Sequence, residues 1–494
     1  MSAALILATT FALRADTGAD AELQYQLGSL LFEESRYSEA LVAFDRAMSA
    51  PDAVLATRAR KGKVRAALRV AEFSLARETA ESLNTAPTAD AEGIALYGDA
   101  LWASGRFDGA DAAYIRAAHT SSGSPRAEYG RARTLATVSK LQEALDVALA
   151  ASATAPRDGE IHALIGEIYE RLYRYDEAAA ALRRYVNLLP NKDRSDKAAW
   201  ARAQVDFLES FKGVTPVDID PQDREVLHTL PFRLVNDKVV VRARVNGSSA
   251  QDFVLDTGSE ETIISADTAR RQGVKPVTYT VSAGVGEVGM RGLQLARLQS
   301  LDFGTLQVRN VPVLVKSPPL RGMPKPEGES FSPLSLGLSM TIDYEKRLLT
   351  IGSRLPDAEA DHHLPMRIHR LAMVRGLLNG TYPAYFVVDT GGEVISISAE
   401  TAEELTPLTS SPSRRIPLRV WGTSGWDRDA FLLPGVNLGF DRIEYRNFPL
   451  VVLNLRAPSL LLGFQLGGIV GHKFLAPYRV SMDLVHSELR LEKP

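Results

Sequence analysis

Two copies of one tripeptide hold the residues of this chain whose types and spacing could do chemistry. Asp256-Thr257-Gly258 and Asp389-Thr390-Gly391 each follow an apolar run rich in β-branched residues, in the stretches 253–265 and 386–398. Such a run predicts a buried strand, and the glycine predicts a tight turn directly after it. Each turn would present one carboxylate, and paired carboxylates are suited to general acid and base chemistry.

The match between the two copies extends well beyond the tripeptides. At the same offset of 133 residues, further pairs recur along both stretches. They are Asn246-Gly247 with Asn379-Gly380, Ser265-Ala266 with Ser398-Ala399, and Thr268-Ala269 with Thr401-Ala402. Leu230-Pro231 and Leu364-Pro365 open the two copies, and Ile342-Asp343 and Met482-Asp483 stand in their last strands. The chain therefore carries two related lobes, each with one aspartate on an equivalent turn.

Composition bounds the class of protein. At 494 residues the chain is too long for one core, so two to four domains are expected. The net charge of −3 gives no basic surface, so nucleic acid is not an expected partner. The chain has no cysteine, which excludes disulfides, thiolate metal sites and cysteine nucleophiles.

The extreme N-terminus is a short apolar stretch at residues 3–13. It is too short to span a bilayer, and Ala15 could end a cleavable signal. We assign residues 1–20 to a signal or leader segment, which places the protein in the periplasm or outside the cell. Without cleavage the alternative is an N-terminal helix and a cytoplasmic protein. No membrane span is expected elsewhere.

Residues 21–212 predict a helical repeat. Gly28, Gly98 and Gly166 mark a period of roughly twice 34 residues, with weaker copies near Gly62 and Ala132. Small residues let paired helices approach, while aromatic and aliphatic positions fill the space between repeats. The pattern resembles the tetratricopeptide repeat over residues 21–191, with residues 197–211 as a capping helix. The resemblance implies an all-α superhelix that recruits substrate or partner proteins; a role as spacer or dimerisation element stays open.

The character of the sequence changes after residue 212. Residues 213–228 are rich in Pro and Asp and predict a linker. Short alternating strands with Gly or Asn turns then run to the C-terminus, interrupted by a polar stretch at 356–363. We therefore expect lobe one at 229–355, a connector at 356–363 and lobe two at 364–494.

Each lobe has two hydrophobic residues before Asp-Thr-Gly, and lobe two also has Ile469-Val470-Gly471. This combination resembles the retropepsin-like aspartic peptidases, and bacterial members that carry N-terminal tetratricopeptide repeats in particular. The resemblance covers residues 229–494 and implies an all-β, bilobal acid-protease-like domain pair. It implies that Asp256 and Asp389 form the catalytic dyad, which shares one proton around a water molecule and titrates as a unit.

The neighbours of the aspartates have expected supporting roles. Gly258 and Gly391 allow the backbone to turn so that amide groups face the carboxylates. The resemblance implies that Thr257 and Thr390 bond across the lobe interface and lock the two turns together. The substrate would be an extended polypeptide bound as an added strand.

Flaps over the dyad are expected from one hairpin of each lobe. In lobe one we place the flap at residues 283–289, with Gly284 and Gly286 facing substrate. In lobe two we place it at residues 421–426, with Trp421 and Gly422 facing substrate. Trp421 and Trp426 could wall a subsite, although a core or surface role fits them equally well.

Other motifs are weaker. Asp16-Thr17-Gly18 lacks the flanking apolar runs, and the G-x-G-x-x-G pattern at 284–289 lacks the strand–turn–helix context of a dinucleotide site. The histidines of Asp361-His362-His363, with His369, are expected to be solvated rather than metal ligands. We expect no metal and no cofactor, and no serine-hydrolase or metalloprotease motif is present.

Two features depart from the family pattern. Gly392 stands where Ala or Ser usually follows the tripeptide. In lobe one, Leu336-Gly337 is followed six residues later by Asp343, whereas twelve residues separate Gly471 from Asp483. This spacing predicts that lobe one has lost the short helix after its glycine, or that residues 330–340 rearrange.

The sequence therefore favours an aspartic endopeptidase that acts as a monomer or homodimer on polypeptides. The rival interpretation is a catalytically inactive peptide- or protein-binding scaffold on the same fold. A third is that each lobe pairs with its twin in another chain.

Overall fold

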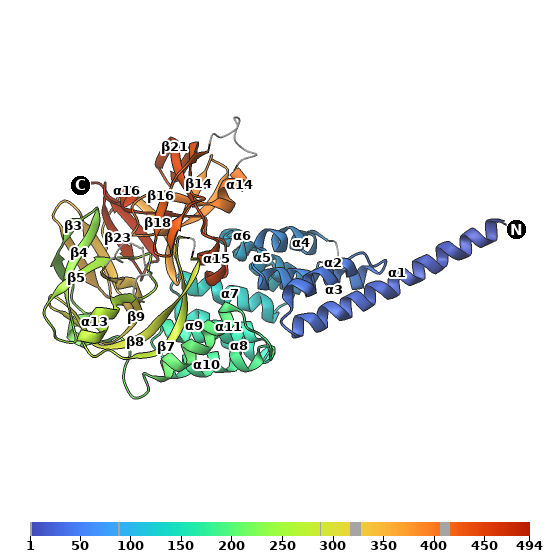
Figure 1. The fold of residues 1–494 in the computed structure, drawn as a ribbon, viewed down its shortest axis with the longest axis horizontal. Coiled ribbons are helices and arrows are strands. Elements are labelled where there is room, and N and C mark those ends of the chain that lie inside the picture. Colours follow the sequence, from blue (N-terminus) through green and yellow to red (C-terminus); the bar gives the residue numbers. More distant parts are fainter. Residues whose placement is uncertain (1, 87–88, 287, 317–327, 406–414) are drawn as a thin grey trace.

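The computed structural model describes residues 2–86, 89–286, 288–316, 328–405 and 415–494, with side chains from Gly18 onward. Helices fill the N-terminal part, and two β lobes lie against one end of the helical stack (Figure 1). The described helices of the N-terminal part are α1 (Ser2–Glu33), α2 (Tyr37–Ala47), α3 (Ala53–Arg69), α4 (Phe73–Thr85), α5 (Ala91–Ala103), α6 (Phe107–Thr120), α7 (Pro125–Thr137), α8 (Leu141–Thr154), α9 (Gly159–Arg171), α10 (Tyr175–Leu188) and α11 (Asp196–Glu209).

The turns inside the helix pairs repeat with a regular spacing. One residue of each turn has left-handed φ, from 57° to 68°, and successive ones are 34 to 36 residues apart. These residues are Ser35, Ala71, Gly105, Ser139 and Tyr173. Because the same tight turn recurs between α1 and α2, α3 and α4, α5 and α6, α7 and α8, and α9 and α10, the helices form five repeats.

Glycines on the first helices let bulky side chains of the second helices approach. A Cβ on Gly28 would lie 2.8 Å from the Phe44 ring, and one on Gly98 would lie 2.6 Å from the Tyr114 ring. In the fourth repeat the close approach to Tyr114 is made by Gly130, two residues before the Ala132 that the sequence pattern indicated. The close contact between Gly130 and Tyr114 therefore shows that Gly130, and not Ala132, is the position of close helix approach in this repeat.

The N-terminal apolar stretch lies in α1, whose backbone is one continuous helix with the first repeat (Figure 1). None of the helices in the described part of the chain combines the length and apolar character needed to cross a bilayer.

Lobe one is mostly a nine-stranded sheet. Its elements are β1 (Asp218–Ile219), α12 (Pro221–Arg224), β3 (Arg233–Val235), β4 (Lys238–Val245), β5 (Gln251–Leu255), β6 (Thr262–Ser265), α13 (Ala266–Arg271), β7 (Pro276–Ala283), β8 (Met290–Phe303), β9 (Leu306–Lys316), β10 (Glu329–Phe331) and the 3₁₀ turn η1 (Pro333–Leu336). The expected linker at 213–228 contains β1, which pairs with β9, so this stretch is part of the lobe-one sheet rather than a free tether.

Lobe two repeats the same plan. Its elements are β13 (His362–His369), β14 (Leu371–Leu378), β15 (Tyr382–Val388), β16 (Ile395–Ser398), α14 (Ala399–Leu405), β17 (Ile416–Pro417), β18 (Val420–Gly422), β19 (Gly425–Asp427), β20 (Phe431–Phe440), β21 (Ile443–Leu453), α15 (Arg456–Leu462), β22 (Gly468–Val470) and α16 (His472–Leu475). The expected connector at 356–363 ends inside β13, because His362 and His363 pair with β24.

Equivalent strands pair in the same way in the two lobes. In lobe one, β5 runs parallel to β10, β10 antiparallel to β6, and β6 parallel to β9. In lobe two, β15 runs parallel to β22, β22 antiparallel to β16, and β16 parallel to β21. The sequence duplication is therefore also a duplication of strand topology.

A shared sheet joins the lobes. Its strands are β2 (His228–Pro231), β12 (Leu348–Gly352), β11 (Ser339–Asp343), β23 (Arg479–Asp483), β24 (Glu488–Glu492) and β13, in that order. The strands β11 and β23 meet at its centre, with Met340 opposite Met482 and Ile342 opposite Val480. One continuous hydrophobic core runs through both lobes.

The helical repeats pack directly on both lobes. Phe207, Leu208 and Phe211, from α11 and the turn after it, share a core with Leu295 and Leu314 of lobe one. Residues of α5 and α6 share another core with Tyr385, Val387 and Phe464 of lobe two. The repeats thus brace the two lobes from one side.

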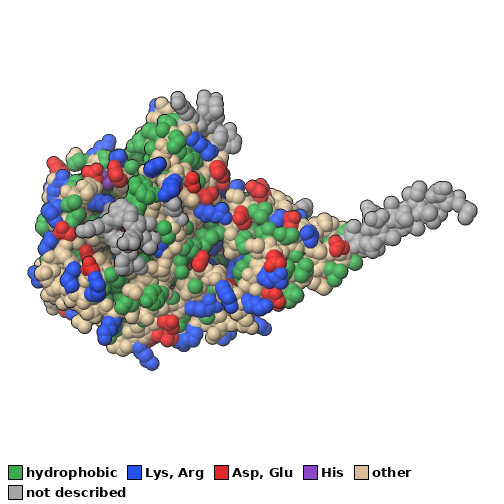
Figure 2. Space-filling model, in the orientation of Figure 1, with side chains coloured by type: hydrophobic (Ala, Val, Ile, Leu, Met, Phe, Trp, Pro, Cys, Tyr) green, Lys and Arg blue, Asp and Glu red, His purple; other side chains and the backbone are tan. Residues whose placement is uncertain are grey.

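Basic and acidic side chains are intermixed on the face of the molecule that Figure 2 shows, over both the repeats and the lobes. This distribution agrees with the small net charge of −3.

Candidate active site

The two Asp-Thr-Gly turns follow equivalent strands. Asp256 comes directly after β5 and donates its backbone N–H to Phe331 of β10, at 2.9 Å. Asp389 comes directly after β15 and donates its N–H to Val470 of β22, at 3.0 Å. In each lobe a parallel neighbouring strand therefore fixes where the aspartate leaves the sheet.

The threonines of the two turns bond reciprocally across the lobe interface. The Thr257 hydroxyl donates to the Val388 carbonyl at 2.6 Å, and the Thr390 hydroxyl donates to the Leu255 carbonyl at 2.8 Å. Each hydroxyl also accepts the backbone N–H of the other threonine, at 3.0 and 3.1 Å. Both threonines are only 1% exposed, so these four bonds are shielded from water and hold the turns in register.

The carboxyl groups of Asp256 and Asp389 lie next to each other, and each lies against the glycine of the opposite turn. A Cβ on Gly258 would lie 2.6 Å from Oδ1 of Asp389, and a Cβ on Gly391 would lie 2.6 Å from Oδ1 of Asp256. Any side chain at either glycine would therefore collide with the opposite carboxyl. The need for glycine at these positions is steric as well as conformational.

The hydrogen bonds around the pair differ between the two carboxyls. Asp389 Oδ1 accepts the N–H groups of Gly391 and Gly392 at 2.8 and 2.9 Å, whereas Asp256 Oδ1 accepts only that of Gly258, at 3.1 Å. Backbone donors stabilise an ionised carboxylate. The shared proton is therefore favoured on Asp256, and the negative charge on Asp389.

The pKa shifts follow from the same contacts. Burial and then the negative charge of Asp389 raise the pKa of Asp256, against the opposing effect of Lys316 and Lys238. Burial also raises the pKa of Asp389, while the two backbone donors and the bond from Asp256 hold it down. The pair can thus keep one proton well above the pH at which a free carboxyl loses it, and present a base and an acid together.

The missing side chain at Gly392 has a physical reason. Its N–H donates to Asp389, and a Cβ there would lie 2.8 Å from Asp389 Oδ2. The backbone of Gly471 also packs against Gly392, and its own Cβ would lie 2.6 Å from the Gly392 carbonyl oxygen. Glycine at 392 lets the turn close tightly around the carboxylate.

Of the two alternatives for lobe one, loss of the short helix is wrong, and rearrangement of residues 330–340 is what the structure has, because the short helical turn comes before Gly337. The Phe331 carbonyl accepts the N–H of Asp256 in lobe one, as the Val470 carbonyl accepts the N–H of Asp389 in lobe two. The next residue in each lobe is therefore equivalent, so Gly471 corresponds to Ser332 and not to Gly337. The turn η1 then follows at residues 333–336, as α16 follows Gly471. Gly337 instead ends η1 with φ of 66°, and a Cβ there would collide with the Tyr173 hydroxyl of the helical repeats.

The two glycine-rich hairpins that were expected to be flaps meet near their tips, although position 287 of the first lies outside the described residues. Ser424 donates its N–H to the Val285 carbonyl at 2.9 Å, and Val288 donates its N–H to the Ser424 carbonyl at 3.1 Å. Gly284, Gly286 and Gly422 are in close contact at this junction, where a Cβ on any of them would collide with the opposite hairpin. The hairpins therefore form a closed bridge between the lobes.

Trp421 and Trp426 lie on the same hairpin, on β18 and β19. Their rings stack edge to face at 5.1 Å and are 37% and 42% exposed. They do not belong to the core. The two tryptophans are therefore either ordinary surface residues or the wall of a substrate subsite.

A contact that the sequence does not indicate ties the lobe-one turn to the rest of the molecule. Arg370, in the tight turn between β13 and β14, bonds Glu260 through Nε at 2.7 Å, four residues after Asp256. Its guanidinium also donates to the Leu461 carbonyl at 3.2 Å and lies 5.1 Å from the Trp200 ring centroid. One arginine of lobe two therefore connects the aspartate turn of lobe one to helix α11. No pattern in the sequence marks it, because a charged residue in a turn is usually solvated.

Partly buried carboxyls gather beside this arginine. Burial raises the pKa of Glu261 well above its ordinary value, helped by the charges of Glu170 and Glu260. Burial, with neighbouring Glu167, raises the pKa of Glu170 of α9 to about 7. The seam between the repeats and the lobe-one turn is therefore sensitive to pH.

Other sequence motifs have ordinary positions. The pattern at 284–289 joins the antiparallel strands β7 and β8 rather than a strand and a helix. His362 is only 8% exposed, so the expectation that it is solvated is wrong: its place in β13 against β24 buries it. His369 is partly buried, near Trp102 and Phe464, and burial lowers its pKa to about 3. Within the described residues, no three His, Asp or Glu side chains gather in a way that could hold a metal ion.

Comparison with known proteins gives two partial matches by family. Residues 241–323 match the family described as gag-polyprotein putative aspartyl protease, and residues 159–192 match the tetratricopeptide repeat. The first match covers β4 to β9 with Asp256, and the second covers α9 and α10. No match was found among curated proteins.

Solved tetratricopeptide proteins resemble the helical part. A thermophilic one from Thermus thermophilus is 20% identical, covers 38% of this chain and 99% of its own, and gives a TM-score of 0.32. One from Parabacteroides merdae is 14% identical over 38% of this chain and 72% of its own, with a TM-score of 0.29. The chain thus joins a tetratricopeptide-repeat region to a β region that includes a gag-like aspartyl protease domain.

Proposed function

We propose that this protein is an aspartic endopeptidase of the retropepsin-like type, with both lobes of its bilobal β region in one chain. The observation that carries the proposal is the pair of Asp-Thr-Gly turns, locked by reciprocal threonine bonds with their carboxyls in contact. Since one chain supplies both aspartates, the pair does not depend on a second copy. The gag-like match over residues 241–323 supports the same activity class.

In this mechanism Asp389 acts as the base and Asp256 as the acid. Asp389 takes a proton from a water molecule, whose oxygen attacks the scissile carbonyl carbon, while Asp256 gives its proton to the carbonyl oxygen. The resulting tetrahedral diol collapses when a proton moves to the amide nitrogen and the C–N bond breaks. The closed flap bridge must open to admit the chain and then shield the reaction from bulk water.

The substrate in this proposal is an extended polypeptide, bound through backbone hydrogen bonds beneath the flap hairpins. Trp421 and Trp426 are exposed aromatic surface on one hairpin and suit contact with apolar substrate side chains. The helical repeats hold both lobes and recruit substrate or partner proteins on the surfaces that the lobes leave open.

Single substitutions test the proposal. Asp256→Asn and Asp389→Asn should each abolish cleavage of a fluorogenic peptide library, because a pair with one carboxyl cannot supply both acid and base. The matched control is Asp267→Asn, whose carboxylate is 67% exposed on α13 and should leave cleavage unchanged.

A hydroxyl-containing transition-state analogue gives a second readout. It should bind the unaltered protein and bind either dyad variant at least about a hundredfold more weakly. Undiminished cleavage in either dyad variant defeats the mechanism. A protein that binds peptides but neither cleaves them nor discriminates the analogue is the non-catalytic scaffold.

A further inference from the structure

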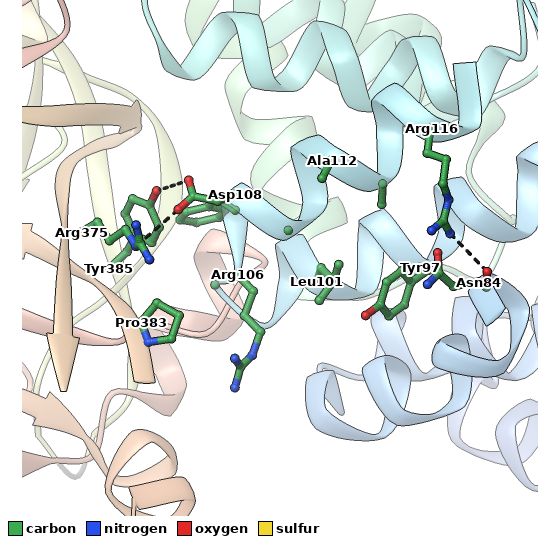
Figure 3. Close-up of a pocket in the computed structure, with 14 residues that line it drawn as sticks. Asn84, Tyr97, Leu101, Arg106, Asp108, Ala112, Arg116, Arg375, Pro383 and Tyr385 are labelled. Atoms are coloured by element: carbon green, nitrogen blue, oxygen red, sulfur yellow. Dashed lines mark hydrogen bonds and ion pairs between the residues drawn. The ribbon is translucent and has the colours of Figure 1, made fainter. Parts of the chain in front are cut away.

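A cavity of about 460 Å³ lies between the helical repeats and lobe two, away from the aspartate turns. Its walls come from the α5 and α6 region of the repeats and from β14 and β15 of lobe two (Figure 3). Pockets of this size hold small ligands or short peptide segments. The activity proposed above makes no use of it.

Arginines dominate the charge of the cavity. Arg106, Arg116 and Arg375 line it with a single carboxylate, Asp108. Asp108 is already neutralised without Arg375, because it accepts the Tyr385 hydroxyl at 2.7 Å and pairs with Arg367 at 3.0 Å. The wall is therefore positive in a chain whose net charge is −3.

The arginines differ in how far their charges are satisfied. Arg106 pairs with Glu404 at 2.8 Å and lies over the Tyr382 ring. Arg116 donates to the Asn84 carbonyl at 3.2 Å, and the described residues give it no carboxylate partner. Arg375 is 54% exposed, and among the described residues the carboxylate that it contacts is Asp108, at 3.4 Å. Arg116 and Arg375 are thus the cations available to an incoming anion.

The two cations stand at opposite ends of an apolar floor. Figure 3 shows Arg375 with Tyr385 at the lobe-two end, Arg116 with Asn84 and Tyr97 at the other, and Leu101 and Ala112 between them. Asp108 and Arg116 are eight residues apart on α6, a rise of about 12 Å. An extended peptide covers that length with about four residues.

A second observation favours this surface over the face formed by the first helices of the repeats. That face, with Trp102, Tyr129 and Trp200, is already occupied by the Arg370 turn and the end of α15 from lobe two, and only about 60 Å³ remains between them. The cavity beside α5 and α6 is several times larger, at about 460 Å³. It is the more open recess between the repeats and lobe two.

We propose that the cavity binds a short extended peptide segment that carries carboxylates beside apolar side chains, such as the acidic tail of a partner protein. Arg116 binds a carboxylate at one end and Arg375 a carboxylate at the other, while the apolar residue between them packs on Leu101 and Tyr97. Tyr385 lies on β15, four residues before Asp389, so the bound segment also touches the strand that holds one aspartate turn. The proposal concerns binding and stands whether or not the dyad cleaves peptides.

Fluorescence anisotropy of the full-length protein tests it. The probe is a fluorescein-labelled Asp-Leu-Leu-Asp peptide with an amidated C-terminus, compared with its Asn-Leu-Leu-Asn analogue and with the Asp-Leu-Leu-Asn peptide bearing a free terminal carboxylate. The acidic probes should bind at least about tenfold more tightly than the neutral one, as expected for charge-assisted hydrogen bonds. The two acidic probes also distinguish which carboxylate is recognised. Tighter binding of the amidated probe indicates the side-chain carboxylate, and tighter binding of the other indicates the chain terminus.

Matched variants locate the binding. Arg116→Ala should weaken the acidic probe about tenfold, and Ala112→Trp, which fills the floor without changing charge, should abolish binding. Arg446→Ala removes an exposed arginine, 83% accessible, that does not line the cavity, and should change nothing. Equal affinity for acidic and neutral probes, or equal losses in Arg446→Ala and Arg116→Ala, overturns the proposal. Asp389→Asn should bind the probe unchanged, which separates this test from that of the dyad.

Discussion

Replacing Thr257 with valine removes the centre of the bond network between the two lobes while keeping the side-chain shape. The substitution deletes the bond from the Thr257 hydroxyl to the Val388 carbonyl, at 2.6 Å, and leaves the Thr390 N–H without its acceptor. Both groups are buried and cannot turn to water, since Thr257 and Thr390 are each 1% exposed.

The cost follows from the number of groups left unsatisfied. A buried donor or acceptor that loses its partner costs about 1 to 3 kcal/mol. Two such groups predict that Thr257→Val lowers the free energy of unfolding by about 2 to 6 kcal/mol. Thr257→Ser keeps the hydroxyl and loses only a methyl group, so it should cost about 1 kcal/mol.

Urea unfolding followed by tryptophan fluorescence and circular dichroism measures these differences. Thr262 supplies the matched control: it is fully buried in the same lobe, and its hydroxyl has no hydrogen-bond partner among the described residues. Thr262→Val should therefore be neutral or stabilising. If Thr257→Val and Thr262→Val change stability equally, the bonds between the turns contribute nothing and the reasoning fails.

Three further predictions follow from the same contacts. Gly258→Ala should reduce peptide cleavage at least about a hundredfold, because the new methyl collides with the Asp389 carboxyl and displaces it; wild-type rates would contradict the packing. The cleavage rate should stay high to a higher pH than a free carboxyl would allow. It should then fall as pH rises through the raised pKa of the dyad, since the pair loses its shared proton there. A cleavage rate that still increases above about pH 8 would contradict the shared proton. Burial raises the pKa of Glu170 from 4.5 to about 7, so the protein loses stability as pH rises between these values. Glu170→Gln should therefore raise the free energy of unfolding by up to about 3 kcal/mol at about pH 8 but not at about pH 4. Denaturant unfolding measured at the two pH values tests this difference.

The sequence could indicate both aspartate turns because their signals are local. An apolar run, a tight turn and a second copy in register are all visible in the order of residues, and the structure brings Asp256 and Asp389 into contact. Their catalytic role stays a prediction. The helical repeats were equally readable, because Gly28, Gly98 and Gly166 mark where one helix must approach another.

Features that depend on contacts between distant parts of the chain could not be predicted from the sequence. Ser332 takes the place of a glycine, and only the bond from Asp256 to Phe331 identifies it. The contact between Arg370 and Glu260 joins residues 110 positions apart, from different lobes, so it depends on how the two lobes meet. His362 looked solvated in a polar stretch, yet the strand it begins is covered by its neighbours.

The sheet shared by the lobes bears on how the two-lobed chain evolved and on whether its halves can reassemble as separate fragments. Because β11 and β23 pair with each other at its centre, each lobe taken alone would expose an unpaired strand edge. The simplest way to cover that edge is a twin copy, so a single-lobe ancestor is expected to have been an obligate homodimer that gene duplication later fused. By the same logic, a polypeptide cut at residue 358 should reassemble from its two fragments, each completing the other's sheet.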